Sequence, residues 1–376
     1  MNELISTLEK NELQLLSQKK YTDLQNRMDE NEKENKPLFD AFTDMDMLFW
    51  FIHQRKNISQ TKENNARTKY EYERELKQFI TNLLQFAPQI DLDIHRNVSD
   101  SLLRQIEARH LRRYQEWLTI ESPHVLEHGT YSPATLARKT TIIKAFFTFL
   151  YTSGYSSFDA AKGLRAATVH ADDRPNRDLG PNEVTEILDT LEKVDLRFYT
   201  IILTLVTTGL RNEELCQLTL GSIKRDFIQG DYYFEVTGKG NKRRDVPIKA
   251  HLLERLAFYR EAYLLSELFK GERDEPLFCT RSGKAYKPTY LAQSMSKLFK
   301  KTDFPTLDQQ SIHITAHTFR HAYAIISHLN KVDVYDIMRS LGHEKIDTTM
   351  IYLAKITARS TNAIHSWSST TLGKHF

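Results

Sequence analysis

The segment AHTFRHAY, residues 316–323, gathers titratable and cationic side chains at the start of an apolar helical pattern. It contains His317, Arg320 and His321. A phosphate would suit this set, because an arginine fork donates to two oxygens at once, histidine moves protons, and the positive end of a helix attracts anions. Taken alone, the segment also fits an ordinary helix start with a hydrogen-bonded packing histidine.

A metal ion is a third candidate ligand for this segment. His313, His317 and His321 recur every four positions, so on one helix they would share a face. No cysteine lies nearby, and no glutamate stands between the histidines as in the zinc-binding pattern H-E-x-x-H. Zinc is therefore the least favoured of the three interpretations, and we expect no metal.

Composition sets broad limits on the chain. Its 376 residues favour two or three domains, and its net charge is only +3. Residues 1–59 hold 8 Lys and Arg against 11 Asp and Glu, and the remainder holds 44 against 38, a mild basic lean. Cys216 and Cys279 give no disulfide framework, and we find no signal-peptide pattern and no apolar run long enough to span a bilayer. We expect a soluble cytoplasmic protein with no membrane contact.

The hydrophobic pattern divides the chain into four parts. These are an accessory helical segment at 1–59, an all-helical region at 60–168, a linker at 169–178, and a mixed region at 179–376. In the all-helical region, helices are expected over 68–86, 99–118 and 132–154.

The mixed region combines helices with a β-hairpin. Helices are expected over 183–193, 198–209, 249–270 and 288–301, with one more beginning near residue 316. The stretch DYYFEVTGKGNKRRDVPI, residues 231–248, reads as two short strands joined by a glycine-rich turn.

Four further residues of this region could act on a phosphate together with the opening segment. Arg211 follows a glycine break and opens a helix, and Lys239 stands between two glycines at the hairpin tip. His343 follows Gly342, an expected helix C-cap, and Tyr352 lies near the start of the next helix. Each also has an ordinary explanation: an arginine paired with a nearby glutamate, a solvated turn lysine, a loop histidine and a packing aromatic.

The order of these motifs, TTGLRNEEL, TGKGNKRRDVPI, HTFRHAYA and LGHEKIDTTMIY, resembles the phage integrase or tyrosine recombinase family. That family's catalytic domain carries Arg, Lys, His-x-x-Arg, His or Trp, and Tyr in this order, and every position is filled here. The motifs span 207–352, and the region 60–168 resembles the family's helical core-binding domain. The resemblance implies a mainly α fold with a small β-sheet or hairpin in the catalytic domain, and a two-domain clamp around DNA.

The resemblance also implies a reaction. Tyr352 would attack a DNA phosphodiester, giving a 3′-phosphotyrosyl link and a free 5′-hydroxyl. Arg211 and Arg320 would hold the non-bridging oxygens and stabilise the charge of the transition state. Because the phosphotyrosyl bond retains the energy of the broken one, rejoining needs neither ATP nor metal, and we expect no cofactor.

The remaining site residues are assigned in the same way. Lys239 would give its proton to the departing 5′-oxygen. His317 and His343 would hydrogen-bond the phosphate or move protons, with His317 as the acid–base group. Glu214 would orient the first arginine through a salt bridge, and His321 would support the structure.

Basic residues outside this set suit contacts with duplex phosphates, although a solvated face explains them equally well. The candidates for these contacts are Arg112, Arg113, Arg138, Lys139, Lys242, Arg243 and Arg244. In the family, recombination uses four protomers on two duplexes. The resemblance therefore implies double-stranded DNA and a homotetramer as partners, and it leaves open accessory proteins that set direction.

Two other functions stay open. A DNA-binding regulator could keep this fold without strand exchange, but it should have lost active-site residues, and none is lost here. A relaxing enzyme of the topoisomerase type would use the same phosphotyrosine step without site specificity; the helical region ahead of the catalytic one favours the recombinase. The additional residues 1–59 favour service to a mobile element over a chromosome-dimer resolvase.

Overall fold

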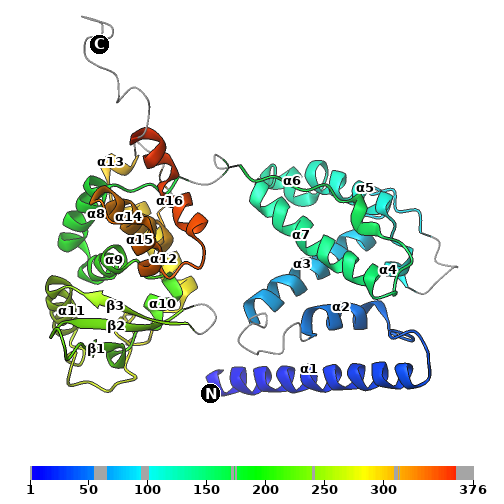
Figure 1. Cartoon of the computed structure of the whole chain (residues 1–376), viewed down its shortest axis with the longest axis horizontal. Coiled ribbons are helices and arrows are strands. Elements are labelled where there is room, and N and C mark those ends of the chain that lie inside the picture. Colours follow the sequence, from blue (N-terminus) through cyan, green and yellow to red (C-terminus); the bar gives the residue numbers. More distant parts are fainter. Residues whose placement is uncertain are drawn as a thin grey trace, which may run out of the picture. The chain divides into compact units, whose positions relative to one another are not determined.

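The computed structural model describes residues 2–54, 66–94, 101–170, 173, 176–238, 242–308, 312 and 314–360 (Figure 1). The chain divides into two compact units, Met1–Arg174 and Pro175–Phe376. Each unit has a hydrophobic core of its own. The division falls inside the stretch that the sequence marks as a linker.

The first unit is built of helices. They are α1 (Asn2–Lys33), α2 (Asp44–His53), α3 (Ala66–Gln85), α4 (Leu102–Gln105), α5 (Ala108–Ile120), α6 (Pro123–His128), α7 (Pro133–Thr152) and the 3-10 helix η2 (Ala160–Gly163). The helix α7 begins as the sequence indicates, with Ser132 as a cap that accepts from the N–H of Thr135. The single helix expected over 99–118 is instead split into α4 and α5, because Ile106 is extended and turns fully into the core.

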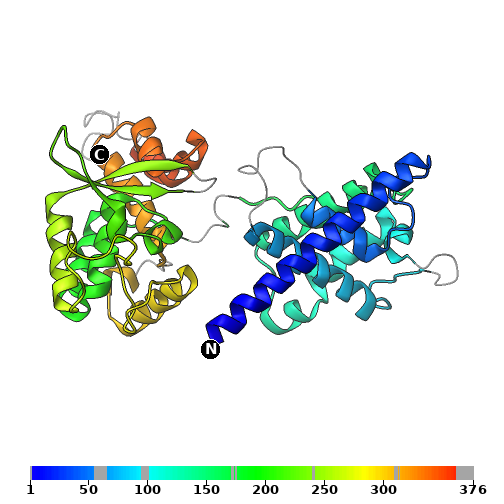
Figure 2. The ribbon, with the colours of Figure 1, turned by 90° about the horizontal axis from the view of Figure 1, so that it is seen from below.

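The helix α2 belongs to the same core as the helices that follow it. Its Met47 and Phe51 are buried together with Phe79 of α3 and Phe146 of α7. The rings of Phe51 and Phe146 have their centroids 5.2 Å apart. The long helix α1 crosses the face of this unit (Figure 2) and buries Leu24 in the same cluster. The segment that the sequence sets apart as accessory thus contributes to one core with the later helices.

The second unit combines helices with a small antiparallel sheet. Its helices are α8 (Pro181–Val194), α9 (Leu196–Thr208), α10 (Asn212–Cys216), η4 (Leu220–Ser222), α11 (Ala250–Ala262), α12 (Pro288–Lys301), α13 (Pro305–Asp308), α14 (Ala316–Leu329), α15 (Val334–Leu341) and α16 (Ile346–Ser360). Its strands are β1 (Ile223–Arg225), β2 (Tyr232–Thr237) and β3 (Arg243–Ile248), in the order β1–β2–β3. The expected hairpin is β2–β3, with Val236 opposite Arg244. The strand β1 is an addition, too short to be read from the sequence, and the helix expected over 249–270 ends at Ala262.

The helix α9 lies at the centre of this unit and is covered by α8, α11 and α14. It buries Ile201 and Leu205 completely. A smaller cluster joins α14, α15 and α16 through Leu341, Tyr352 and Leu353, and so fixes the first turns of α16. The structure confirms a mainly helical fold with a small sheet. None of the described helices is long and apolar enough to cross a bilayer.

Candidate active site

A capping box holds the first turn of α14. The hydroxyl of Thr315 accepts from the backbone N–H of Thr318, and the hydroxyl of Thr318 accepts from the backbone N–H of Thr315. From this turn Arg320 and His321 are buried, while His317 is exposed. The segment therefore places Arg320 and His321 inside the protein and His317 at its surface.

Arg320 is a buried guanidinium that binds the ends of two other helices. Its Nη1 donates to the carbonyl of Gly209 at 2.6 Å, and its Nη2 donates to the carbonyl of Leu341 at 2.5 Å. Gly209 is the C-cap residue of α9 and Leu341 is the last residue of α15, and carbonyls at helix ends lack partners within the helix. Burial, and then repulsion from Arg211, lowers the pKa of Arg320 to about 10, so the group is charged at neutral pH. One positive charge thus joins α9, α14 and α15.

Arg211 is the N-cap residue of α10 and forms the expected salt bridge. Its Nη1 donates to Oε1 of Glu214 at 2.7 Å, and its Nη2 donates to the carbonyl of Gly342 at 3.1 Å. The side chain remains 34% exposed, so it can meet a ligand that approaches from outside.

Arg244 also binds Glu214. Its Nη1 and Nη2 donate to Oε1 and Oε2 of the carboxylate, each at 2.8 Å. The expectation that Arg244 faces a duplex together with Lys242 and Arg243 therefore needs correction, since its fork is turned inward. Strand alternation in the sequence indicates this inward direction, because Arg244 lies on the same face of β3 as the buried Val246.

Glu214 is a buried carboxylate between these two arginines. Burial alone would raise its pKa, but hydrogen bonds from Arg244 and from the backbone and side chain of Arg211 outweigh burial and hold the pKa at about 2. The site therefore contains a permanent negative charge whose partners are fixed.

Tyr352 lies among three histidines. Its Oη is 3.4 Å from Nε2 of His317. Its ring centroid is 3.8 Å from that of His321 and 5.4 Å from that of His343. The ring of His343 is held in turn, with Nδ1 2.9 Å from the hydroxyl of Thr349. Tyr352 is only 7% exposed, so these contacts cover most of it.

The three histidines are neutral at neutral pH. Desolvation within the site, followed by the charges of Arg177 and Arg320, lowers the pKa of His317 to about 4. Burial, and then the neighbouring His317, lowers the pKa of His321 to about 3. Burial and Arg320 lower the pKa of His343 to about 4. A neutral imidazole can accept a proton, which a charged one cannot.

Arg177 is a neighbour of the site that the sequence places in the linker. Its charge lowers the pKa of both His317 and His321. Its Nε is buried and makes no hydrogen bond within the described residues. No pattern in the single sequence distinguishes Arg177 from the other charged residues around it.

Lys239, the expected general acid, and His313, named only in the disfavoured zinc interpretation, lie outside the described residues. The backbone beside Lys239 is described: the N–H of Gly238 donates to the carbonyl of Lys242 at 2.8 Å. The ammonium of Lys242 is exposed and lies 2.5 Å from Oε1 of Glu344. Arg243 is exposed as well.

The basic pair on α5 is divided in its contacts. Arg112 is exposed. Arg113 is occupied by acidic neighbours, with its Nη2 3.0 Å from Asp91 and its Nη1 3.4 Å from Asp93. Arg112 is therefore the freer of the two to meet a phosphate.

The basic pair on α7 is divided by burial. Arg138 is 43% exposed in its side chain and lies 3.0 Å from Glu75. Lys139 is buried, with its ammonium 2.7 Å from the other oxygen of Glu75. The expected phosphate contact of Lys139 thus needs correction, because its charge is enclosed. Helical spacing in the sequence indicates this burial, since Lys139 lies on the face of α7 that buries Ile143 and Phe146.

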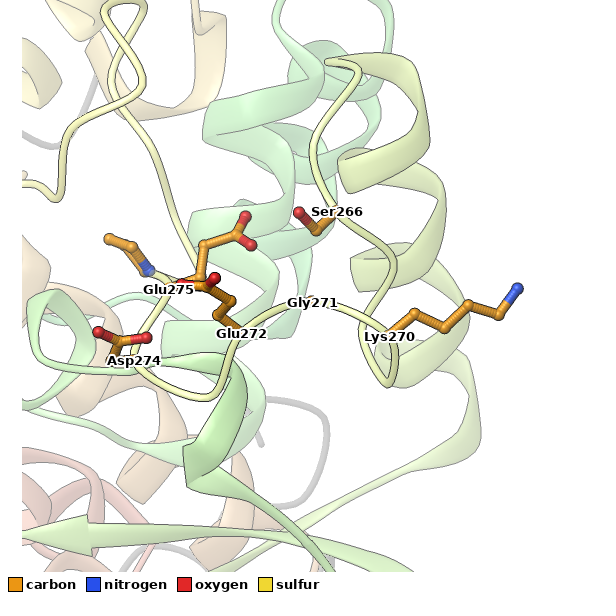
Figure 3. Close-up of a pocket in the computed structure, with 7 residues that line it drawn as sticks. Ser266, Lys270, Gly271, Glu272, Asp274 and Glu275 are labelled. Atoms are coloured by element: carbon orange, nitrogen blue, oxygen red, sulfur yellow. The ribbon is translucent and has the colours of Figure 1, made fainter.

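A cavity of about 470 Å³ lies elsewhere in the second unit (Figure 3). It is lined by Ser266, Lys270, Gly271, Glu272, Asp274, Glu275 and Pro276. It includes none of the residues described above and is not part of this site. Within the described part of the chain, no group of three or more His, Cys, Asp or Glu side chains is placed to hold a metal ion.

Comparison with known sequences places this site in context. The model of the phage integrase family matches residues 177–359. A tyrosine recombinase XerD of Chlamydia trachomatis is 30% identical over 228 residues, covering 59% of this chain and 70% of the relative. A tyrosine recombinase XerC of Proteus mirabilis is 26% identical over 248 residues, covering 64% of this chain and 76% of the relative.

Solved structures share the fold. XerH site-specific recombinase bound to a palindromic difH substrate aligns with a TM-score of 0.56 at 20% identity, over 86% of this chain and 96% of the other. A lambda integrase tetramer bound to a Holliday junction aligns with a TM-score of 0.56 at 14% identity, over 82% of this chain and 78% of the other.

Proposed function

Since this chain belongs to the phage integrase family and is a site-specific tyrosine recombinase, we propose that Tyr352 is the nucleophile with which it cleaves DNA. The phenolic oxygen forms a bond to phosphorus while the bond to the 5′-oxygen breaks, which leaves a 3′-phosphotyrosyl link and a free 5′-hydroxyl. One observation carries the proposal: Tyr352 Oη lies 3.4 Å from Nε2 of His317, in a site that also holds two arginines.

The cleavage step requires one group to accept the phenolic proton and another to protonate the departing 5′-oxygen. His317 is neutral, so its Nε2 takes the phenolic proton as the oxygen attacks. Lys239, on the resemblance to the family, gives a proton to the departing 5′-oxygen. In rejoining, the 5′-hydroxyl attacks phosphorus and both proton transfers reverse.

The arginines hold the phosphate. Arg320 donates to the carbonyls of Gly209 and Leu341, and its other N–H groups bind the non-bridging oxygens. Because the carbonyls fix its guanidinium before DNA arrives, Arg320 stabilises charge in the transition state without reorganisation. Arg211 is about one-third exposed and binds the phosphate from its open side. His343 donates a hydrogen bond to the phosphate, and the ring of His321 supports Tyr352.

The partners follow from the same proposal. The substrate is double-stranded DNA, and four copies act on two duplexes, as in the lambda integrase tetramer bound to a Holliday junction. The helical first unit and the catalytic second unit close on the DNA as a clamp, with phosphate contacts from exposed basic residues such as Arg112, Arg138, Lys242 and Arg243. The protein acts in the cytoplasm for a mobile element, with accessory proteins as candidates for setting direction.

A suicide substrate tests the nucleophile. A duplex is selected from a random library by repeated binding, and a nick placed near the cleavage position lets the freed end diffuse away. In EDTA, wild type should form an adduct that resists denaturant and is destroyed by protease. Tyr352→Phe keeps the ring and the packing, so it should bind the duplex equally well and form no adduct.

The alternative is a regulator that binds DNA without cleaving it. Absence of an adduct from wild type on a duplex that it binds would favour this alternative. An adduct formed by Tyr352→Phe would show that another residue is the nucleophile.

A further inference from the structure

We propose that Arg244 is a positioning residue that, through Glu214, holds the base of the β2–β3 hairpin against the phosphate-binding Arg211. The inference rests on the proposed function, because it concerns how the general acid of that reaction, Lys239, is brought to the site.

Glu214 is bound on both oxygens from two elements. Its Oε1 accepts from Nη1 of Arg211 at 2.7 Å and from Nη1 of Arg244 at 2.8 Å. Its Oε2 accepts from the backbone N–H of Arg211 at 2.8 Å and from Nη2 of Arg244 at 2.8 Å. The carboxylate is therefore shared between the start of α10 and strand β3.

The base of the β2–β3 hairpin, at Gly238, lies next to the ion pair of Glu214 and Arg244. A Cβ added at Gly238 would come within 3.1 Å of Glu214 Oε1 and 3.4 Å of Arg244 Nη1. The N–H of Gly238 donates to the carbonyl of Lys242, which closes the hairpin at this level. Gly238 is the residue that directly precedes Lys239 in the sequence.

A third element meets the same arginine. Gly342 has a φ of +64°, and a Cβ added there would lie 3.3 Å from Cδ of Arg244. The carbonyl of Gly342 accepts from Nη2 of Arg211, and His343 follows it in the chain. Arg244 thus stands where three segments meet, each of which carries a residue of the proposed reaction.

The interaction needs an arginine. A lysine ammonium is a single point charge and cannot donate in parallel to both oxygens of a carboxylate, whereas the guanidinium fork does so. In Arg244→Lys the charge is retained and the fork is removed, so the hairpin base should be held less firmly with little change in net electrostatics.

The experiment uses two suicide substrates that differ in one atom. One has the ordinary bridging 5′-oxygen at the cleavage position, and the other has sulfur there. Sulfur leaves as a thiolate without needing a proton, so a defect in the general acid is relieved by the sulfur substrate. A defect in charge stabilisation by Arg211 or in folding is not relieved.

We expect Arg244→Ala and Arg244→Lys to slow cleavage of the oxygen substrate by about tenfold to a hundredfold, a partial loss of the roughly 10²–10⁴-fold that a general acid contributes. Both should cleave the sulfur substrate at nearly the wild-type rate, as should Lys239→Ala. Arg211→Ala should be slow on both substrates. Asp245→Ala, at the exposed neighbour of Arg244 on β3, should match wild type on both.

An equal defect of the Arg244 variants on both substrates overturns the inference, and so does a Lys239→Ala defect that sulfur does not relieve. If Arg244→Ala does not fold, Arg244→Lys decides by the same comparison. A wild type that forms no adduct with either substrate contradicts the proposed function itself, so the two failures are distinguishable.

Discussion

Tyr352 and His317 of one chain lie with their Oη and Nε2 atoms 3.4 Å apart, so the proposed nucleophile lies in a site formed by its own chain. The other groups around it, Arg211, Arg320 and His343, belong to that same unit. Each copy should therefore cleave without help from a neighbour's tyrosine.

A mixing experiment tests this arrangement. Tyr352→Phe lacks the nucleophile, and Arg320→Ala lacks a buried donor to the transition state, so each should lose cleavage by several orders of magnitude. Mixed on one suicide substrate, the two variants should still give no adduct above the sum of their separate levels. Adduct formation by the mixture would mean that one copy supplies its tyrosine to the site of another.

The buried His321 predicts a loss of stability in acid. The pKa of His321 is about 3 in the folded chain, against about 6.5 for an ordinary histidine. Between these values the unfolded chain binds more protons, so the free energy of unfolding falls as pH is lowered through this window, by at most about 1.4 kcal/mol per pH unit for this group.

Urea unfolding at several pH values measures that slope. His321→Leu should flatten it, because the substituted side chain takes up no proton in either state. His251→Ala, at an exposed histidine of α11, should leave the slope unchanged. Equal slopes in wild type and His321→Leu would refute the assignment.

The buried ion pair of the first unit predicts an asymmetry between variants. Glu75 and Lys139 are both buried and their charged atoms lie 2.7 Å apart. Glu75→Gln leaves the ammonium of Lys139 buried without a full partner and should cost about 3–5 kcal/mol of unfolding free energy. Lys139→Met combined with Glu75→Leu should recover most of that loss, since an apolar pair of similar volume is often neutral.

The matched control is Arg74→Ala, which removes a largely exposed partner of the same carboxylate. It should cost no more than about 1 kcal/mol. A double variant as unstable as Glu75→Gln alone would argue against the ion pair as the cause.

The two arginines of α5 should differ in their effect on DNA binding. Arg112 is exposed, whereas Arg113 is engaged by Asp91 and Asp93. Arg112→Ala should weaken binding to every duplex and lower the slope of log affinity against log salt by about one for each phosphate that the variant no longer neutralises. Arg113→Ala should change the slope less. Fluorescence anisotropy across a salt series measures both, and an unchanged slope for Arg112→Ala would remove that residue from the interface.

Sequence reasoning succeeds here where order along the chain carries the information. The motif order predicts which residues share a site, and the structure brings Arg211, His317, Arg320, His343 and Tyr352 together. It also predicts the mainly helical fold with its hairpin, because those elements have strong periodic patterns and caps.

The failures arise where a residue's direction matters more than its type. Arg244 and Lys139 stand in basic runs that suggest a surface, yet each lies on the buried side of its own strand or helix. The two-residue period of a strand and the 3.6-residue period of a helix indicate this inward direction, but a run of basic residues suggests an exposed surface instead. The strand β1 spans only three residues, Ile223–Arg225, and is defined by its pairing with β2 rather than by its own pattern.

The near-complete burial of Tyr352 bears on the fidelity of the whole reaction. A phosphotyrosyl ester can be resolved either by a DNA hydroxyl or by water, and water is far more abundant. With only 7% of the tyrosine exposed and histidine rings against it, an ester formed there is largely shielded from bulk solvent. On the proposed function, hydrolysis of this ester by water is therefore disfavoured relative to rejoining by the DNA hydroxyl.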